Sequence, residues 1–182
     1  MRHDNNAECE GGYEMPTLTS ELEVLIATTV WLVRNDWNIE AISVAGGRGL
    51  PPIDYQKEDI RKAFNAESVP FDKKMFKPRG PDIVARSHEG IWKIECKGLG
   101  KGKASTHRTN FDRAVASAMS YFDTPSMRLG LALANDYLWA YNFSERLPQA
   151  LRKATNLWVF LLEKGTIYPY EPTEEIPFPG AA

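Results

Sequence analysis

The sequence predicts an α/β fold in which a mixed central sheet is flanked by helices. Segments with helical periodicity alternate with short apolar ones, and turn-like residues separate two pairs of those short segments. The chain has 182 residues, of which 43% are hydrophobic and 25% charged, as in an ordinary globular protein. We expect a single domain over residues 17–170, between a flexible N-terminal arm (1–16) and an irregular, acidic, proline-rich tail (171–182).

The domain is expected to begin with a helix. From Ser20 to Asn35 apolar residues recur at helical spacing, and Ser20 followed by Glu23 has the form of a capping box. A strand over 38–45 follows and stops at a glycine-rich loop. A short helix is then expected over 54–64.

The middle of the chain predicts a β-hairpin. Strand-like residues 82–86 and 91–97 are separated by Ser-His-Glu-Gly, a turn signal. A helix over 110–122 follows, with Asn110 as its cap. The remaining expected elements are a strand over 127–135, a helix over 144–155 and a closing hairpin of 157–162 with 166–170.

Composition excludes several classes of protein and site. The two cysteines, Cys9 and Cys96, can form neither a disulfide framework nor a four-cysteine zinc site. The three histidines are too scattered for a zinc pattern. The longest apolar stretches are about a third of the roughly 20 residues that a membrane span needs, and the N-terminus does not resemble a signal peptide. We therefore expect a cytoplasmic protein without membrane contact.

The strand over 91–97 presents its charges on one face. Alternate side chains of a strand share a face, so Glu95 and Lys97 point the same way. Trp92 and Cys96 point the other way, with the residues expected to pack on a helix. Cys96 is accordingly expected to be a buried, unreactive thiol.

The hairpin predicts that two carboxylates meet. A turn centred between His88 and Glu89 puts Asp82 directly opposite Glu95, with Cβ atoms roughly 4.5–5.5 Å apart. Like charges at that separation repel each other unless a cation lies between them. Lys97 can neutralise them in part, but a hard divalent cation such as Mg²⁺ suits the pair better.

At these residues the sequence resembles a known family. Pro81-Asp82, twelve residues and then Glu95-Cys96-Lys97 resemble the signature of the PD-(D/E)xK nuclease superfamily. The order of elements over about residues 20–135 is similar to that family's restriction-endonuclease-like three-layer core. The resemblance implies an Mg²⁺- or Mn²⁺-dependent nuclease that hydrolyses phosphodiester bonds, chiefly in DNA. By the family pattern, Asp82 and Glu95 bind the metal and Lys97 assists the attacking water.

The resemblance also directs attention to two helices. The family often adds an acidic residue from the first helix, for which Glu21 and Glu23 are both candidates, although Glu23 also fits the capping role. Some of these nucleases carry a Gln-x-x-x-Tyr pair in the helix after the lysine strand. Here Ser117-x-x-x-Tyr121 has a similar position, with Ser instead of Gln.

Basic residues gather around the motif. From Lys73 to Arg113 there are eleven basic and four acidic residues, a net +7, whereas the rest of the chain carries −9. This distribution is typical of a surface that contacts nucleic-acid phosphates. The candidate contacts are Lys101, Lys103, Arg108 and Arg113.

Two alternatives stay open. The first is a nuclease-fold module that binds nucleic acid or a protein partner without cutting. The second is an ordinary charged hairpin edge, with Lys97 in a surface ion pair. A homodimer is compatible with a nuclease that cuts both strands, although the sequence identifies no interface.

Overall fold

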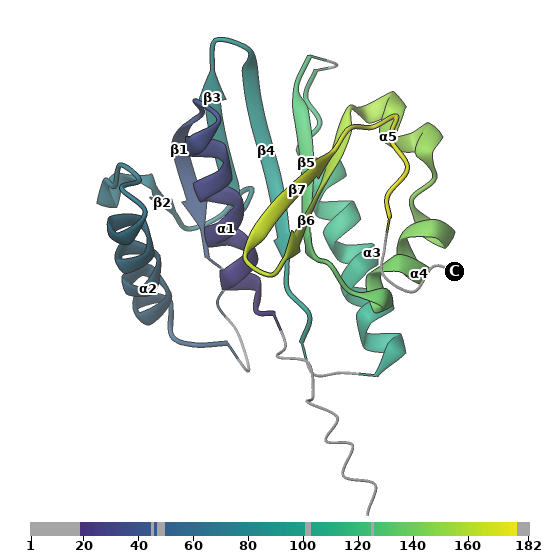
Figure 1. The fold of residues 1–182 in the computed structure, drawn as a ribbon, viewed down its shortest axis with the longest axis horizontal. Helices are drawn as coiled ribbons and strands as arrows, with labels where there is room; N and C mark the ends of the chain where they lie inside the picture. Colours follow the sequence, from purple (N-terminus) through teal and green to yellow (C-terminus); the bar gives the residue numbers. More distant parts are fainter. Residues whose placement is uncertain (1–18, 45, 47–49, 101–102, 125, 178–182) are drawn as a thin grey trace, which may run out of the picture.

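The fold is an α/β arrangement of one seven-stranded mixed sheet with helices on both faces (Figure 1). This confirms the predicted class. A computed structural model describes the chain over residues 19–44, 46, 50–100, 103–124 and 126–177. The expected arm, residues 1–16, lies outside the described residues. Residues 171–177 carry no helix or strand.

The sheet has the strand order β2-β1-β3-β4-β5-β6-β7. The pairs β1–β3, β3–β4 and β6–β7 are antiparallel, whereas β1–β2, β4–β5 and β5–β6 are parallel. The strands are β1 (Asn38–Ser43), β2 (Phe76–Lys77), β3 (Ile83–Ser87), β4 (Gly90–Lys97), β5 (Arg128–Ala134), β6 (Leu157–Glu163) and β7 (Thr166–Tyr170).

The helices are α1 (Glu21–Arg34), α2 (Ile53–Ala66), α3 (Ala104–Ser120), α4 (Tyr137–Arg146) and α5 (Gln149–Thr155), with a 3₁₀ turn, η1 (Lys73–Met75). Helix α1 packs on the sheet from β1 to β7, and α2 lies beside α1 (Figure 1). Helix α3 packs on β4 and β5 and also contacts α4. None of the helices in the described part of the chain is long and apolar enough to cross a membrane.

Helices α1 and α3 cover opposite faces of the sheet. Trp31 of α1 packs on Phe160, and Phe160 packs on Trp92 of β4. Tyr121, which caps the end of α3, bonds instead to Glu95 of β4. Trp92 and Glu95 point to opposite faces of the strand. The helices that pack on these two sides therefore cover opposite faces of the sheet.

The central hairpin has the predicted register. Ile83 pairs with Ile94 and Ser87 with Gly90, so the turn is centred between residues 88 and 89. Gly90 has φ +136°, a backbone conformation that residues other than glycine rarely adopt. Strand β3 begins at Ile83, one residue after the start expected from the sequence, and Asp82 directly precedes it.

Two predicted helices differ in extent from those observed. Helix α3 begins at Ala104, so Asn110 lies inside it rather than at its cap. The additional turn forms because buried His107 lies one helical turn before buried Phe111, which extends the apolar stripe. The single helix expected over 144–155 is two, α4 and α5, separated at Pro148, which has no N–H for a continuing helix.

Candidate functional site

Strand β4 carries the two charged side chains at the centre of the site. Glu95 is only 7% exposed although it is charged, which is unusual for a glutamate. The Tyr121 hydroxyl donates a hydrogen bond to its Oε2 at 3.1 Å, and Ser117 bonds it as well. Two residues of one stripe of α3 therefore hold Glu95 in position against the sheet.

Asp82 joins Glu95 from the start of β3. Its Oδ2 accepts the backbone N–H of Cys96 at 2.7 Å, and its carbonyl accepts the N–H of Ser43 at 3.0 Å. The carboxyl group is thus tied to β4 and its backbone to β1. Among the described residues, none donates a hydrogen bond to Asp82 Oδ1.

The two carboxylates disfavour each other's charge. Burial, followed by the nearby charge of Glu95, raises the pKa of Asp82 from 3.8 to about 8. Burial also raises the pKa of Glu95, against the opposing effects of Lys97 and Tyr121. The structure thus brings together two acids whose shared negative charge is not fully compensated by the protein.

Glu21 and Lys97 complete the cluster, which we call the acidic site (Glu21, Asp82, Glu95 and Lys97). Lys97 Nζ lies 2.8 Å from Glu21 Oε2 and 3.8 Å from Glu95 Oε1. Burial alone lowers the pKa of Lys97, but Glu21, Asp82 and Glu95 outweigh it, so the net shift is upward. The amine is accordingly charged at neutral pH and is held by the neighbouring carboxylates.

Close backbone contact puts Glu21 at the end of β4. The Leu99 N–H donates to the Thr19 carbonyl at 2.7 Å. A Cβ added to Gly98 would lie 2.2 Å from the Glu21 nitrogen, so only glycine fits this crossing. The glycine after Lys97 therefore allows the first turn of α1 to reach the acidic site.

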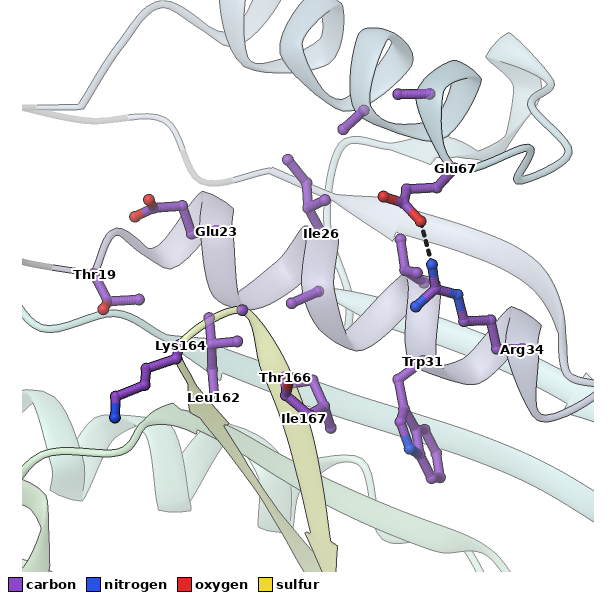
Figure 2. A pocket seen from close by; sticks show the side chains of 15 residues that line it. Thr19, Glu23, Ile26, Trp31, Arg34, Glu67, Leu162, Lys164, Thr166 and Ile167 are labelled. Carbon is purple, nitrogen blue, oxygen red and sulfur yellow. Dashed lines mark hydrogen bonds and ion pairs between the residues drawn. The ribbon is translucent and has the colours of Figure 1, made fainter. Parts of the chain in front are cut away.

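Glu23, the other candidate on this helix, has a different role. The Ser20 N–H donates to Glu23 Oε2 at 2.5 Å, and the Glu23 N–H donates to Ser20 Oγ at 3.1 Å, which is a complete capping box. Its side chain lines a cavity of about 530 Å³ between α1 and the β6–β7 turn, whose far end holds the Arg34–Glu67 ion pair (Figure 2). The structure therefore brings Glu21, and not Glu23, to Lys97.

The acidic site suits a hard cation in its donor chemistry. Mg²⁺ is commonly held by one or two carboxylates and several waters, and Asp82 and Glu95 supply two partly buried carboxylates. Within the described residues there is no group of three or more His, Cys, Asp and Glu side chains that could hold a metal ion. Since Glu21 is bonded to Lys97, a metal would here rest on the Asp82–Glu95 pair.

The predicted phosphate contacts lie along α3. Lys103 is its N-cap, and Arg108 and Arg113 are exposed on the helix. Arg113 does not pair with Asp112, which bonds Arg146 instead. Lys101 lies outside the described residues.

Ion pairing separates the basic residues into two groups. Nine of the described lysines and arginines form ion pairs with acidic side chains. Most of those without such a pair, within the described residues, belong to the two segments on either side of the motif. They are Lys73, Lys74, Lys77, Arg79, Lys103, Arg108 and Arg113.

Sequence reasoning omitted two residues from the site. The sequence predicts that Ser117 and Tyr121 stand where some nucleases carry a Gln-x-x-x-Tyr pair, without assigning them to the site, yet both bond Glu95. Their four-residue spacing was the available signal. The expectation for Cys96 is confirmed, since the thiol is fully buried and burial raises its pKa well above the ordinary value.

Comparisons with known proteins supply no relative. No family model matches the chain, and neither a curated protein nor a solved structure matches it.

Proposed function

We propose that this chain is a metal-dependent nuclease that hydrolyses phosphodiester bonds in DNA at the acidic site. The observation that carries the proposal is the meeting of Asp82, Glu95 and Lys97 from two antiparallel strands, with Glu21 from α1. Asp82, Glu95 and Lys97 are the three residues of the sequence motif, and Asp82 and Glu95 are the pair whose charges remain unbalanced.

The topology supports a restriction-endonuclease-like core. Helix α1 is followed by β1, β3 and β4 as an antiparallel set, and after α3 the chain returns as β5 parallel to β4. That order is similar to the core of the PD-(D/E)xK family. The motif residues lie at the hairpin of β3 and β4, where the family pattern requires them.

The residues of the site divide the chemistry among them. Asp82 and Glu95 would hold Mg²⁺ or Mn²⁺, which when bound lowers the pKa of water and stabilises negative charge on a phosphate. Tyr121 orients Glu95 through its hydroxyl. Lys97, held as a cation by Glu21, donates hydrogen bonds to the attacking water or to a phosphate oxygen.

The distribution of cations supports nucleic acid as the substrate. The basic residues without ion pairs lie chiefly in residues 73–79 and 103–113, on either side of the motif in sequence. Arg113 shares a stripe of α3 with Ser117 and Tyr121, which bond Glu95, so it faces the same side. A phosphate backbone bound there should lose affinity steeply as salt increases.

Cleavage of labelled duplex and single-stranded DNA, with Mg²⁺, with Mn²⁺ and with EDTA, tests the proposal. We expect metal-dependent cleavage by the wild type, and a loss of at least about 1,000-fold in Asp82→Asn, Glu95→Gln and Lys97→Met. Glu89→Gln is the matched control, because Glu89 is an acid of the same hairpin that bonds Arg128 instead. Full activity in all three site variants, or no cleavage by the wild type, overturns the proposal.

One observation favours a second candidate, a module that binds DNA without cutting it. The amine of Lys97 is bonded to Glu21 at 2.8 Å, so the third acid is already paired with the protein's own cation and is not free to bind a metal beside the carboxylate pair. Calorimetry distinguishes the two, since divalent-ion binding that is lost in Glu95→Gln belongs only to the nuclease. DNA binding without divalent-ion binding would favour the module.

A further inference from the structure

A pocket between the first turns of α3 and α4 combines exposed aromatic rings with a cation. Its volume is about 350 Å³, and Ser105 and Arg108 of α3 line it together with Tyr137 and Tyr141 of α4. The two tyrosines are 64% and 67% exposed, although aromatic side chains are usually well covered. Their four-residue spacing puts both rings on one face of α4.

The pocket lies at the same edge of the sheet as the acidic site. Lys97, at the end of β4, pairs with Leu133 of the parallel neighbour β5. Helix α3 begins after β4, and α4 begins after β5, so both start at the edge where those strands end (Figure 1). Adjacent strands are about 4.8 Å apart, so Leu133 lies one strand away from Lys97 in the sheet, and α4 begins three residues after β5 ends.

Helix α3 connects the two places. Its residues Ser117 and Tyr121 bond Glu95, while its first turns carry Ser105 and Arg108 into the pocket. Lys103 and Arg108 form no ion pair with any described residue, so their charge is available to an anionic partner. His107, which also lines the pocket, is buried and packs edge-on against Trp139, so this side of the pocket is part of the packed core.

We infer that this pocket binds an unstacked base of a DNA single strand, so that the nuclease acts on single-stranded or locally opened DNA; the inference rests on the proposed function. Tyrosine rings stack on bases of any sequence, and the planar guanidinium of Arg108 can stack as well. In a duplex the faces of the bases are covered by their neighbours. The exposed rings therefore fit the bases of a single strand, whereas a closed duplex offers phosphates to the cations but no free base face to the rings.

Binding of fluorescein-labelled oligo-dT, followed by anisotropy in EDTA, tests the inference without cleavage. Stacking is worth about 1–3 kcal/mol per base, so Tyr137→Ala with Tyr141→Ala should weaken binding by about tenfold or more. Replacement of both by Phe should restore affinity, because the ring is kept. Tyr168→Ala is the matched control, since Tyr168 is 47% exposed on β7, away from both sites.

The measurements also separate this inference from the nuclease assignment. Duplex affinity should be the same in the double alanine variant and the wild type. Wild-type affinity for oligo-dT in the double variant, or an equal loss for duplex, overturns the stacking site even if the protein cleaves DNA. A selective loss with oligo-dT supports the stacking site even if no cleavage is found.

Discussion

The two faces of the sheet at β4 differ in whether a charged side chain is balanced by its neighbours. On the α1 face, Arg128 lies 5.2–5.9 Å from the ring centres of Trp37, Trp92 and Trp158, and it is bonded to Glu89 at 3.0 Å. On the α3 face, Asp82 and Glu95 share a partly buried place, and the pKa of Asp82 rises to about 8. One strand therefore separates a balanced charge from an unbalanced one.

This difference distinguishes stabilising residues from functional ones. The aromatic cluster of Trp37, Trp92, Trp158 and Phe160, together with Glu89, balances the charge of Arg128. The acidic site is electrostatically costly to fold without a bound cation. Uncompensated charge at a site of this kind is a common sign of function.

The largest expected effect is on the aromatic cluster. Trp92→Ala removes a fully buried ring that packs on three other aromatic residues, so it should lower the free energy of unfolding by about 3–5 kcal/mol. Urea unfolding followed by circular dichroism measures this loss. Tyr168→Ala, on the exposed side of β7, should change stability by less than about 0.5 kcal/mol. A loss below about 1 kcal/mol for Trp92→Ala would contradict the assignment of this face as the core.

The next effect is on the acidic site and depends on pH. The pKa of Asp82 is about 8 in the folded protein against 3.8 ordinarily, so the folded state keeps a proton that the unfolded state releases. The metal-free wild type should therefore lose stability as pH rises from about 4 to about 8. Asp82→Asn removes this loss, so its stability relative to the wild type should rise by several kcal/mol between about pH 4 and about pH 8.

Urea unfolding in EDTA, near pH 5 and near pH 8, checks that difference. The Asn side chain still accepts the Cys96 N–H, so the hydrogen bond at 2.7 Å need not be lost. Asp123→Asn is the control, because Asp123 pairs with Lys93 at the surface. Added Mg²⁺ should stabilise the wild type and not Asp82→Asn. A wild type that gains stability from pH 5 to pH 8, relative to Asp82→Asn, would contradict the raised pKa of Asp82.

A smaller effect is expected where charge is balanced. Arg128→Ala removes a cation from three indole rings and leaves Glu89 unpaired, so unfolding should become easier by about 1–2 kcal/mol. Cleavage and Mg²⁺ binding should stay at the wild-type level, because Arg128 points to the α1 face. Arg128→Lys should recover part of the stability. Loss of Mg²⁺ binding in Arg128→Ala would mean that the two faces of β4 are coupled.

The sequence predicts local features of this molecule well. The alternation of side chains along a strand predicts that Glu95 and Trp92 lie on opposite faces. The turn after Ser87 predicts the observed hairpin register. These succeed because side-chain direction and hairpin pairing depend on near neighbours. Helix α3 was predicted to start too late, because burial of His107 depends on Trp139 of α4, which no local pattern reveals.

The composition of the acidic site depends on distant parts of the chain. Two glutamates of α1 were equal candidates because both lie in its first turn. What distinguishes them is the crossing at Gly98, which brings the backbone of α1 onto the end of β4. Likewise, Tyr121 reaches Glu95 only because α3 packs along β4.

The smallest expected effects concern that pair of glutamates. Glu23→Ala opens the capping box, so the free energy of unfolding should fall by about 0.5–1 kcal/mol while cleavage and metal binding stay unchanged. Glu21→Gln should alter stability by less than that and yet reduce cleavage, since it removes the carboxylate that holds the charge of Lys97. Parallel unfolding and cleavage assays on the two variants measure both quantities. The reverse pattern, with cleavage lost in Glu23→Ala and kept in Glu21→Gln, would place the third acid of the site on the opposite side of α1.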